Sequence, residues 1–202
     1  MADYRLDYTL KLAVENFAKR DPREMAQLSG ACYENNQFRL SFLNQEYLVE
    51  YPTGHVSAGE GESVSIKWQI LFLHYLCHSQ GLPSPNEFIS YKELPDGMVY
   101  IDPFTRRAIQ PMVKLFAHRL IEFRSVAESM GGVFQSLGDI SVSIPVLPKV
   151  AITLVMWSSD DEFPASGNIL FDATAAAYLP TEDYAILASE LIWFIQRKMD
   201  KC

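Results

Sequence analysis

Apolar and polar positions in the first thirty residues repeat at helical spacing. Apolar residues recur three and four positions apart between Leu6 and Phe17, which predicts a first helix ending near Arg20. The run 21–24, Asp-Pro-Arg-Glu, has the residue types of a helix start: an N-cap acid, proline at the first position and glutamate at the third. We therefore predict a second helix that stops at Gly30.

The pattern then changes to partial alternation. Phe38–Phe42 and Tyr47–Tyr51 each alternate in part between apolar and polar residues, and the four residues between them suit a hairpin connection. The polar, glycine-containing run Ala58–Glu62 is predicted to be a loop. Ser63 can cap a helix that runs to about Gln80 and is apolar on most sides, which indicates a central buried helix.

The second half of the chain mixes helices and strands. A short strand is predicted at Met98–Ile101, and Pro111 is predicted to begin a helix, because a proline inside a helix costs about 3 kcal/mol. A C-terminal helix is predicted with Thr181 as its N-cap, acids in its first turn and bases at its far end. Three further strands are predicted, at Ile140–Ile144, Ala151–Trp157 and Asn168–Asp172.

These elements predict an α+β fold, with small antiparallel sheets packed with a central buried helix and a long C-terminal helix. One domain is predicted over residues 1–202, with two possible subregions at 1–85 and 86–202. With 49% hydrophobic residues the chain can fill a sizeable core.

Charge and cysteine content limit the classes of function. The formal net charge of −8 makes non-specific binding to nucleic acid or to an anionic membrane unfavourable. No apolar run approaches roughly 20 residues, and charges interrupt the apolar residues of the N-terminus, so neither a membrane span nor a signal peptide is predicted. Three widely separated cysteines suit a reducing compartment, and a cytoplasmic location is expected.

The charges are distributed unevenly along the chain. Residues 150–196 carry seven acids and no Lys or Arg, whereas residues 106–124 carry five bases and one acid. A basic middle segment is thus followed by an acidic end. We expect the two to meet in the fold, with a pocket between them.

Arg106 and Arg107 are the first candidates for a binding site. They precede the predicted helix start at Pro111, where guanidinium groups and backbone N–H groups could grip a phosphate or carboxylate. The alternative is a salt bridge to the acidic turn. A small anionic ligand is therefore one predicted partner.

Asp160, Asp161 and Glu162 follow a predicted buried strand, and they could orient a polar or cationic group of the same ligand. Together with Asp172 and Glu182 they could also supply oxygen ligands to a divalent cation or a carboxylate pair for acid–base chemistry. The alternative is an ordinary solvated turn.

His74 and His78 lie one helical turn apart with Cys77 beside them, a spacing that can ligate one metal ion from a single helix face. The alternative is a core or helix-end histidine, because the helix is otherwise apolar and no glutamate follows His74 as it does in the zinc motif H-E-x-x-H. No nucleotide-binding loop, nucleophile elbow or cysteine cluster is present, so the sequence identifies no cofactor and leaves open whether the protein is an enzyme.

Four segments together resemble the family called domain of unknown function 3786, which occurs in anaerobic bacteria and archaea. They are HYLCHSQG (74–81), FTRRAIQPMVKLF (104–116), GDISVSIPVLPKVAITLVMW (138–157) and DDEFPASGNILFDATAAAYLPTEDYAILASEL (160–191). Some members resemble fusions to a four-cysteine iron–sulfur domain, but this chain has no such cysteine cluster.

The resemblance implies an accessory or ligand-binding role in anaerobic redox or one-carbon metabolism, beside a corrinoid or iron–sulfur enzyme. Three hypotheses follow from the sequence. The first is a ligand-binding accessory protein, the second a metal-dependent enzyme that uses the acidic turn, and the third a structural interaction subunit.

Overall fold

The computed structural model describes residues 2–59 and 64–201, with the side chains of residues 2–5 left out. The loop predicted up to Glu62 and the predicted cap Ser63 therefore lie largely outside the described residues. Contacts divide the chain into two compact units. Unit 1 comprises Met1–Pro83, Leu147–Lys149 and Ala177–Pro180, and unit 2 comprises Ser84–Val146, Val150–Ala176 and Thr181–Cys202. The predicted single domain stays a prediction, and this division falls close to the predicted subregion boundary.

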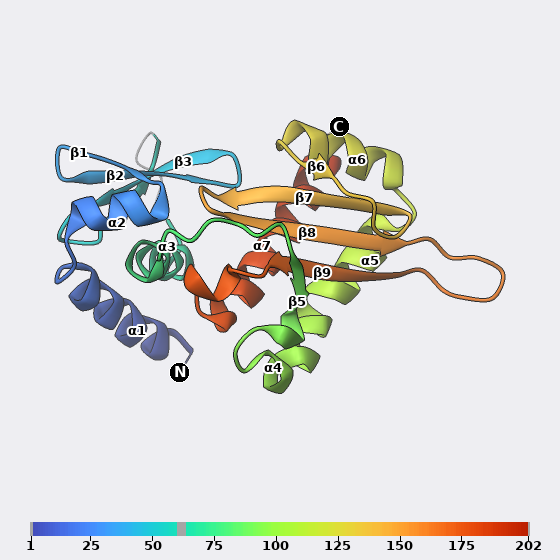
Figure 1. Ribbon diagram of the computed structural model, residues 1–202, viewed down its shortest axis with the longest axis horizontal. Helices are drawn as coiled ribbons and strands as arrows, with labels where there is room; N and C mark the ends of the chain where they lie inside the picture. The colour runs from blue at the N-terminus through green and yellow to red at the C-terminus, as the bar shows by residue number, and fades with distance from the viewer. Residues whose placement is uncertain (1, 60–63, 202) are drawn as a thin grey trace. The chain divides into compact units, whose positions relative to one another are not determined.

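Unit 1 combines helices with a four-stranded antiparallel sheet of order β1-β2-β3-β4 (Figure 1). Its elements are α1 (Ala2–Phe17), α2 (Pro22–Ser29), β1 (Cys32–Glu34), β2 (Gln37–Phe42), β3 (Gln45–Glu50), β4 (Val56–Ala58) and α3 (Ile66–His78).

Local sequence signals account for most of unit 1. The Asp21 carboxylate accepts hydrogen bonds from the N–H groups of Arg23 and Glu24, and Gly30 ends α2 in the left-handed conformation, as predicted. The alternation of β2 buries Phe38, Leu40 and Phe42 on one face. The central buried helix is also confirmed, since α3 packs its aromatic side chains against Phe42 and Tyr47, and Ser65 caps it.

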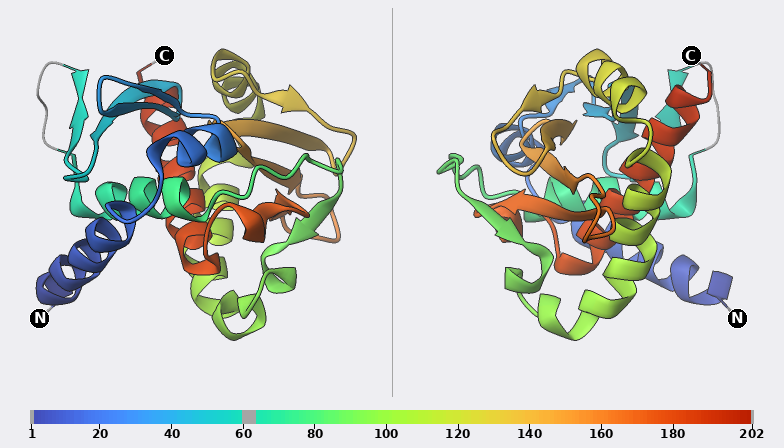
Figure 2. Two further views of the ribbon diagram at one scale, coloured as in Figure 1. Left: turned by 60° about the vertical axis from the view of Figure 1, so that its left-hand side comes forward. Right: turned by 90° about the vertical axis from the view of Figure 1, so that its right-hand side faces the viewer.

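Unit 2 contains a five-stranded sheet of order β5-β9-β8-β7-β6. Its strands are β5 (Phe88–Ser90), β6 (Val133–Phe134), β7 (Ile140–Leu147), β8 (Val150–Trp157) and β9 (Ser166–Asp172). Its helical elements are η2 (Tyr91–Glu93), α4 (Gly97–Phe104), η3 (Thr105–Ile109), α5 (Gln110–Phe116), α6 (Leu120–Ser129), η4 (Ala175–Ala177) and α7 (Thr181–Met199). Figure 2 shows α5 and α7 beside the strands. The α+β prediction with a long C-terminal helix is therefore confirmed.

The strand predicted at Met98–Ile101 is wrong, because this segment lies in α4. Long-range packing overrides the local preference of these residues. Phe104 stacks on Tyr91 with ring centroids 3.9 Å apart, and the absence of a side chain at Gly97 lets α4 approach the Tyr91 carbonyl oxygen. A Cβ atom at Gly97 would lie 1.9 Å from that oxygen.

The helix predicted to begin at Pro111 begins earlier. Residues 97–116 are helical without a break, and the segment η3 in their middle is a π-helix whose Thr105 carbonyl accepts from the Gln110 N–H. Proline has no N–H, so Pro111 cannot donate to the Arg107 carbonyl four residues earlier, and the helix widens at this point instead of ending.

Two smaller predictions also need correction. Strand β7 continues to Leu147, three residues beyond the predicted end at Ile144. The Thr181 hydroxyl donates to the Pro95 carbonyl oxygen at 2.6 Å, so it anchors α7 to the loop before α4 rather than to its own helix.

Candidate functional site

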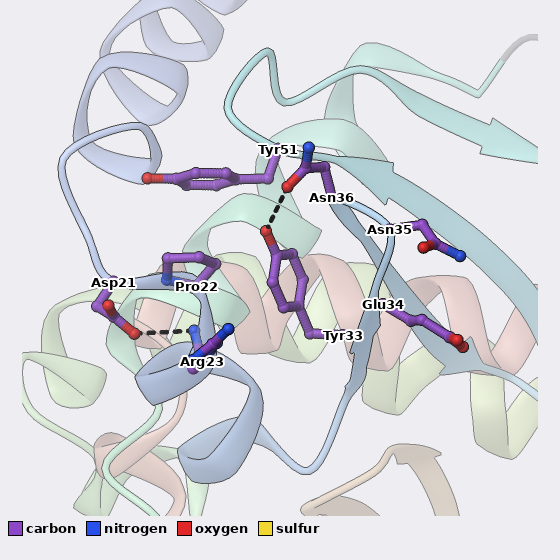
Figure 3. A pocket seen from close by; sticks show the side chains of 8 residues that line it. All are labelled: Asp21, Pro22, Arg23, Tyr33, Glu34, Asn35, Asn36 and Tyr51. Atoms are coloured by element: carbon purple, nitrogen blue, oxygen red, sulfur yellow. Dashed lines mark hydrogen bonds between the residues drawn. The ribbon is translucent and has the colours of Figure 1, made fainter.

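A hollow of about 610 Å³ lies on the surface of unit 1, between the start of α2 and the turn that joins β1 to β2 (Figure 3). We call it the tyrosine hollow, after the two aromatic rings that line it. Its lining residues are Asp21, Pro22, Arg23, Tyr33, Glu34, Asn35, Asn36 and Tyr51. The volume is within the range of about 300–1,000 Å³ that is usual for small-molecule sites.

The turn between β1 and β2 forms the polar side of the hollow. Asn35 and Asn36 have φ angles of 50° and 59°, the left-handed values that asparagine tolerates better than most residues. They connect β1 to β2 in register, with Glu34 opposite Gln37. The Tyr33 hydroxyl donates to Asn36 Oδ1 at 3.0 Å, which leaves the NH₂ group of Asn36 to donate elsewhere.

Tyr51 forms the opposite wall. Its hydroxyl is held by the carbonyl oxygens of Ala18 and Arg20, at 3.2 and 3.1 Å, in the connection between α1 and α2. Its ring makes edge contacts with Tyr33 and Phe17, with centroids 6.3 and 5.5 Å apart. Both tyrosines are half-buried, so the rings are fixed and still present one face to solvent.

The hollow is lined by a cationic hydrogen-bond donor and by anionic acceptors. Arg23 is exposed and forms no ion pair among residues 2–59 and 64–201, so its guanidinium is available as a donor. Glu34 supplies a free carboxylate, whereas Asp21 Oδ1 is already occupied by its two helix-capping bonds. A second, much smaller hollow of about 70 Å³ lies beside it and shares Glu34 and Asn35.

Sequence reasoning did not predict the tyrosine hollow. Two local signals were available: the Asn35–Asn36 pair between two strand-like runs, and Arg23 exposed in the first turn of α2. Nothing in the sequence indicates that Tyr51 lies next to the Asn35–Asn36 pair. The contact follows from the pairing of β2 with β3, which sets Gln37 opposite Glu50.

The structure places Arg106 and Arg107 on the π-helical segment η3, and both are exposed. Phe104 lies beside Phe171 near the end of β9, and Met112 lies beside Gly167 near its start, so this helix runs antiparallel to β9. The two arginines consequently lie alongside the strand and not at the acidic turn that precedes it. Among the described residues no ion pair joins either arginine to that turn.

The acidic turn lies between β8 and β9, and its three acids are exposed. Asp160 organises the turn: its Oδ1 accepts from the N–H groups of Phe163 and Glu162 at 2.7 and 2.9 Å. These two bonds hold the pKa of Asp160 below its usual value. Asp161 and Glu162 face solvent.

Asp172 ends β9, at the opposite end from the acidic turn. Asp172 is the last of the seven residues of β9, so the length of the strand, roughly 20 Å at about 3.3 Å per residue, separates it from the turn. Asp172 therefore cannot share one cation with Asp161 and Glu162. Instead, Asp172 accepts hydrogen bonds from the Ser84 hydroxyl and from the N–H and hydroxyl groups of Thr174. Asp172 thus connects the segment before β5, through Ser84, to the turn after β9, through Thr174.

His74 and His78 lie one turn apart on α3, with ring centroids 5.6 Å apart. His78 Nδ1 donates to the His74 carbonyl oxygen at 2.9 Å, which is a bond typical of a helix end. Burial raises the pKa of the Cys77 thiol to about 11, which disfavours the thiolate form that binds metals. In the part of the chain that the structure describes, no three His, Cys, Asp or Glu side chains gather as a metal site.

Comparison with known proteins identifies the family but no activity. Among the described residues no helix combines the length and the apolar character needed to cross a membrane. No curated protein and no solved structure matches the chain. One family, described as Domain of unknown function (DUF3786), matches residues 21–193. The resemblance noted in the sequence is thus confirmed over most of its length, and the chain belongs to this family.

Proposed function

We propose that this protein binds a small polar ligand in the tyrosine hollow, and that the ligand carries several hydroxyl groups and one carboxylate, as a sugar acid does. The observation that carries the proposal is an exposed guanidinium, Arg23, which lines the same hollow as two fixed tyrosine rings and has no ion-pair partner among the described residues.

The charged groups of the hollow favour a single negative charge on the ligand. Arg23 can form two parallel hydrogen bonds to one carboxylate. Glu34 lines the hollow with its carboxylate turned away from the tyrosine rings (Figure 3), and its charge disfavours a second anionic group on the ligand. The amide groups of Asn35 and Asn36 add both donors and acceptors.

The rings select the shape of the ligand. Tyr33 and Tyr51 each offer an apolar face, against which the C–H groups of a sugar ring can pack. Because the rings are held by hydrogen bonds to Asn36, Ala18 and Arg20, binding costs little side-chain entropy. The hollow is open, so we expect weak to moderate affinity.

The test compares two matched sugars by calorimetry and by NMR titration of backbone amides. D-glucuronate should bind more tightly than D-glucose, and Arg23→Ala should weaken glucuronate binding about tenfold, as expected for loss of a charge-assisted bond. Arg124→Ala removes an arginine from unit 2 and serves as the control. The proposal is wrong if Arg23→Ala binds glucuronate as tightly as the parent protein, or if the shifted amides lie away from residues 21–51.

The family resemblance gives this proposal a setting, namely an accessory role in anaerobic redox or one-carbon metabolism, in the cytoplasm, beside a corrinoid or iron–sulfur enzyme. Its support is the resemblance alone. Purification of the native protein without oxygen tests it, because a corrinoid or iron–sulfur partner that co-elutes has a characteristic visible absorption spectrum. If the protein elutes without a corrinoid or iron–sulfur partner, the proposed accessory role is wrong.

A further inference from the structure

Unit 2 presents a basic face along its longest continuous helical run. Phe104, Ala108, Met112 and Phe116 recur every four residues and are fully buried. Asp102, Arg106, Gln110 and Lys114, two positions before each of them, are exposed. These exposed residues alternate with the buried ones along the helical run, so they lie on its solvent side. Arg106, Arg107 and Lys114 give this face a net positive charge.

The same helical run exposes large apolar side chains at its N-terminal end. Met98 and Val99 in α4 are 66% and 73% exposed, and Tyr100 beside them is also exposed. Consecutive helix residues point about 100° apart, so these side chains spread exposed apolar area around the N-terminal end of α4. Exposed apolar area of this kind marks protein contacts. We call α4 to α5, with these residues and the three bases, the basic-apolar face.

The end of the β8–β9 hairpin has the complementary composition. The connection extends beyond the sheet in Figure 1. It carries Asp160, Asp161 and Glu162, with Phe163 next to them at 66% exposure and Trp157 at its base. We call residues 157–163 the acidic-aromatic tip. Aromatic side chains are enriched among the residues that anchor protein interfaces, and charges around them favour partners of opposite charge.

These two surfaces do not meet within one molecule. The arginines lie alongside β9, because Phe104 contacts Phe171 at one end of that strand and Met112 lies beside Gly167 at the other. Both arginines are exposed, whereas Phe104, Ala108 and Met112 of the same helical run are buried. Trp157 pairs with Ser166 at the start of β9, and residues 158–163 of the tip lie beyond this pair. Among the described residues no ion pair joins Arg106, Arg107 or Lys114 to Asp160, Asp161 or Glu162.

We propose that the basic-apolar face of one copy of this chain binds the acidic-aromatic tip of a second copy, with Arg106 and Arg107 opposite Asp161 and Glu162, and with Phe163 packed against Met98 and Val99. In a two-fold symmetric dimer this contact forms twice. Charge complementarity selects a second copy as the partner, since one chain carries both surfaces and no ion pair joins them among the described residues.

Sedimentation and native mass spectrometry over a range of concentrations test the proposal. The protein should dimerise, and the dimer should weaken at about 1 M salt, where the Debye length is about 3 Å. Arg106→Glu with Arg107→Glu should weaken the dimer at least about tenfold, and so should Asp161→Lys with Glu162→Lys. Lys19→Glu with Lys67→Glu makes the same change in net charge as the arginine pair and should leave the dimer intact, since both lysines are exposed and belong to unit 1.

Mixing the two interface variants is the decisive experiment. Each variant alone opposes like charges in the contact, but the mixture pairs an acidic helix with a basic tip and a basic helix with an acidic tip. A mixed dimer should form with about the affinity of the parent dimer. The proposal is overturned if the parent protein remains monomeric, if the paired substitutions leave its dimer unchanged, or if mixing fails to restore association. Circular dichroism of each variant confirms that the exposed substitutions leave the fold intact.

Discussion

The tyrosine hollow of unit 1 and the two charged surfaces of unit 2 differ in how their side chains are brought together. Residues within 21–51 line the hollow, and hydrogen bonds fix the rings of Tyr33 and Tyr51 in its walls. In unit 2, regular elements hold Arg106 and Asp161 apart. The difference teaches that opposite charges in one sequence need not form one site. Convergent polar groups suit a small molecule, whereas charges spread over exposed faces suit another protein.

The largest effect is expected from Gly97→Ala, which removes the support of the basic-apolar face. The new Cβ atom would lie 1.9 Å from the Tyr91 carbonyl oxygen, so α4 must shift and its stack of Phe104 on Tyr91 must loosen. We expect the free energy of unfolding to fall by about 3 kcal/mol in urea denaturation, as for severe overpacking.

A matched control is Gly59→Ala, because nothing lies within 4 Å of the position that its Cβ would take. That variant should match the parent protein. Equal stability of Gly97→Ala and Gly59→Ala would show that α4 is not fixed by its approach to Tyr91, and the basic-apolar face would lose its structural basis.

An intermediate effect is expected in unit 1 from Tyr75→Phe. The buried Tyr75 hydroxyl donates to the Ser29 carbonyl oxygen at 2.6 Å and accepts from the Lys149 N–H at 3.0 Å. The substitution leaves both backbone groups without this partner and should lower the free energy of unfolding by about 2 kcal/mol. Tyr8→Phe changes an exposed tyrosine and should have no measurable effect. If the two variants unfold alike, the hydroxyl contributes no net stability.

The smallest effect on stability at neutral pH is expected at Cys77, whose thiol reactivity can be compared with that of Cys32 in the same unit. Burial raises the pKa of this thiol from 9.0 to about 11, so its thiolate fraction near pH 8 is roughly a hundredfold lower than in the unfolded chain. Alkylation followed by peptide mass spectrometry should therefore find Cys77 about a hundredfold slower in the folded protein than in urea. Cys32, exposed on β1, provides an internal control for reagent access.

The same shift predicts a dependence of stability on pH. A raised pKa means that the folded state retains the thiol proton, so this contribution is complete below pH 9.0 and is lost as the pH rises toward about 11. Cys77→Ala should make the decline in melting temperature over this interval shallower. An unchanged decline would show that the burial of the thiol does not contribute.

Much of the fold is determined by signals that act over a few residues. The cap at Asp21, the stop at Gly30 and the alternation of Phe38–Phe42 each specify their own element, and all three appear as predicted. The α+β class follows from the same signals, because each alternating segment needs a helix or strand to cover its apolar face. The uneven charge is likewise a property of the sequence.

Tertiary structure decided what those signals could not. Met98–Ile101 became helical because Gly97 and Phe104 pack against Tyr91, and the helix passed through Pro111 by widening into a π turn. The convergence of Arg23, Tyr33 and Tyr51 depends on strand register, and the separation of Arg106 from Asp161 depends on the direction of a helix along β9. Elements are encoded by neighbours in sequence, but a site is encoded by neighbours in space, and these are set only when the core is packed.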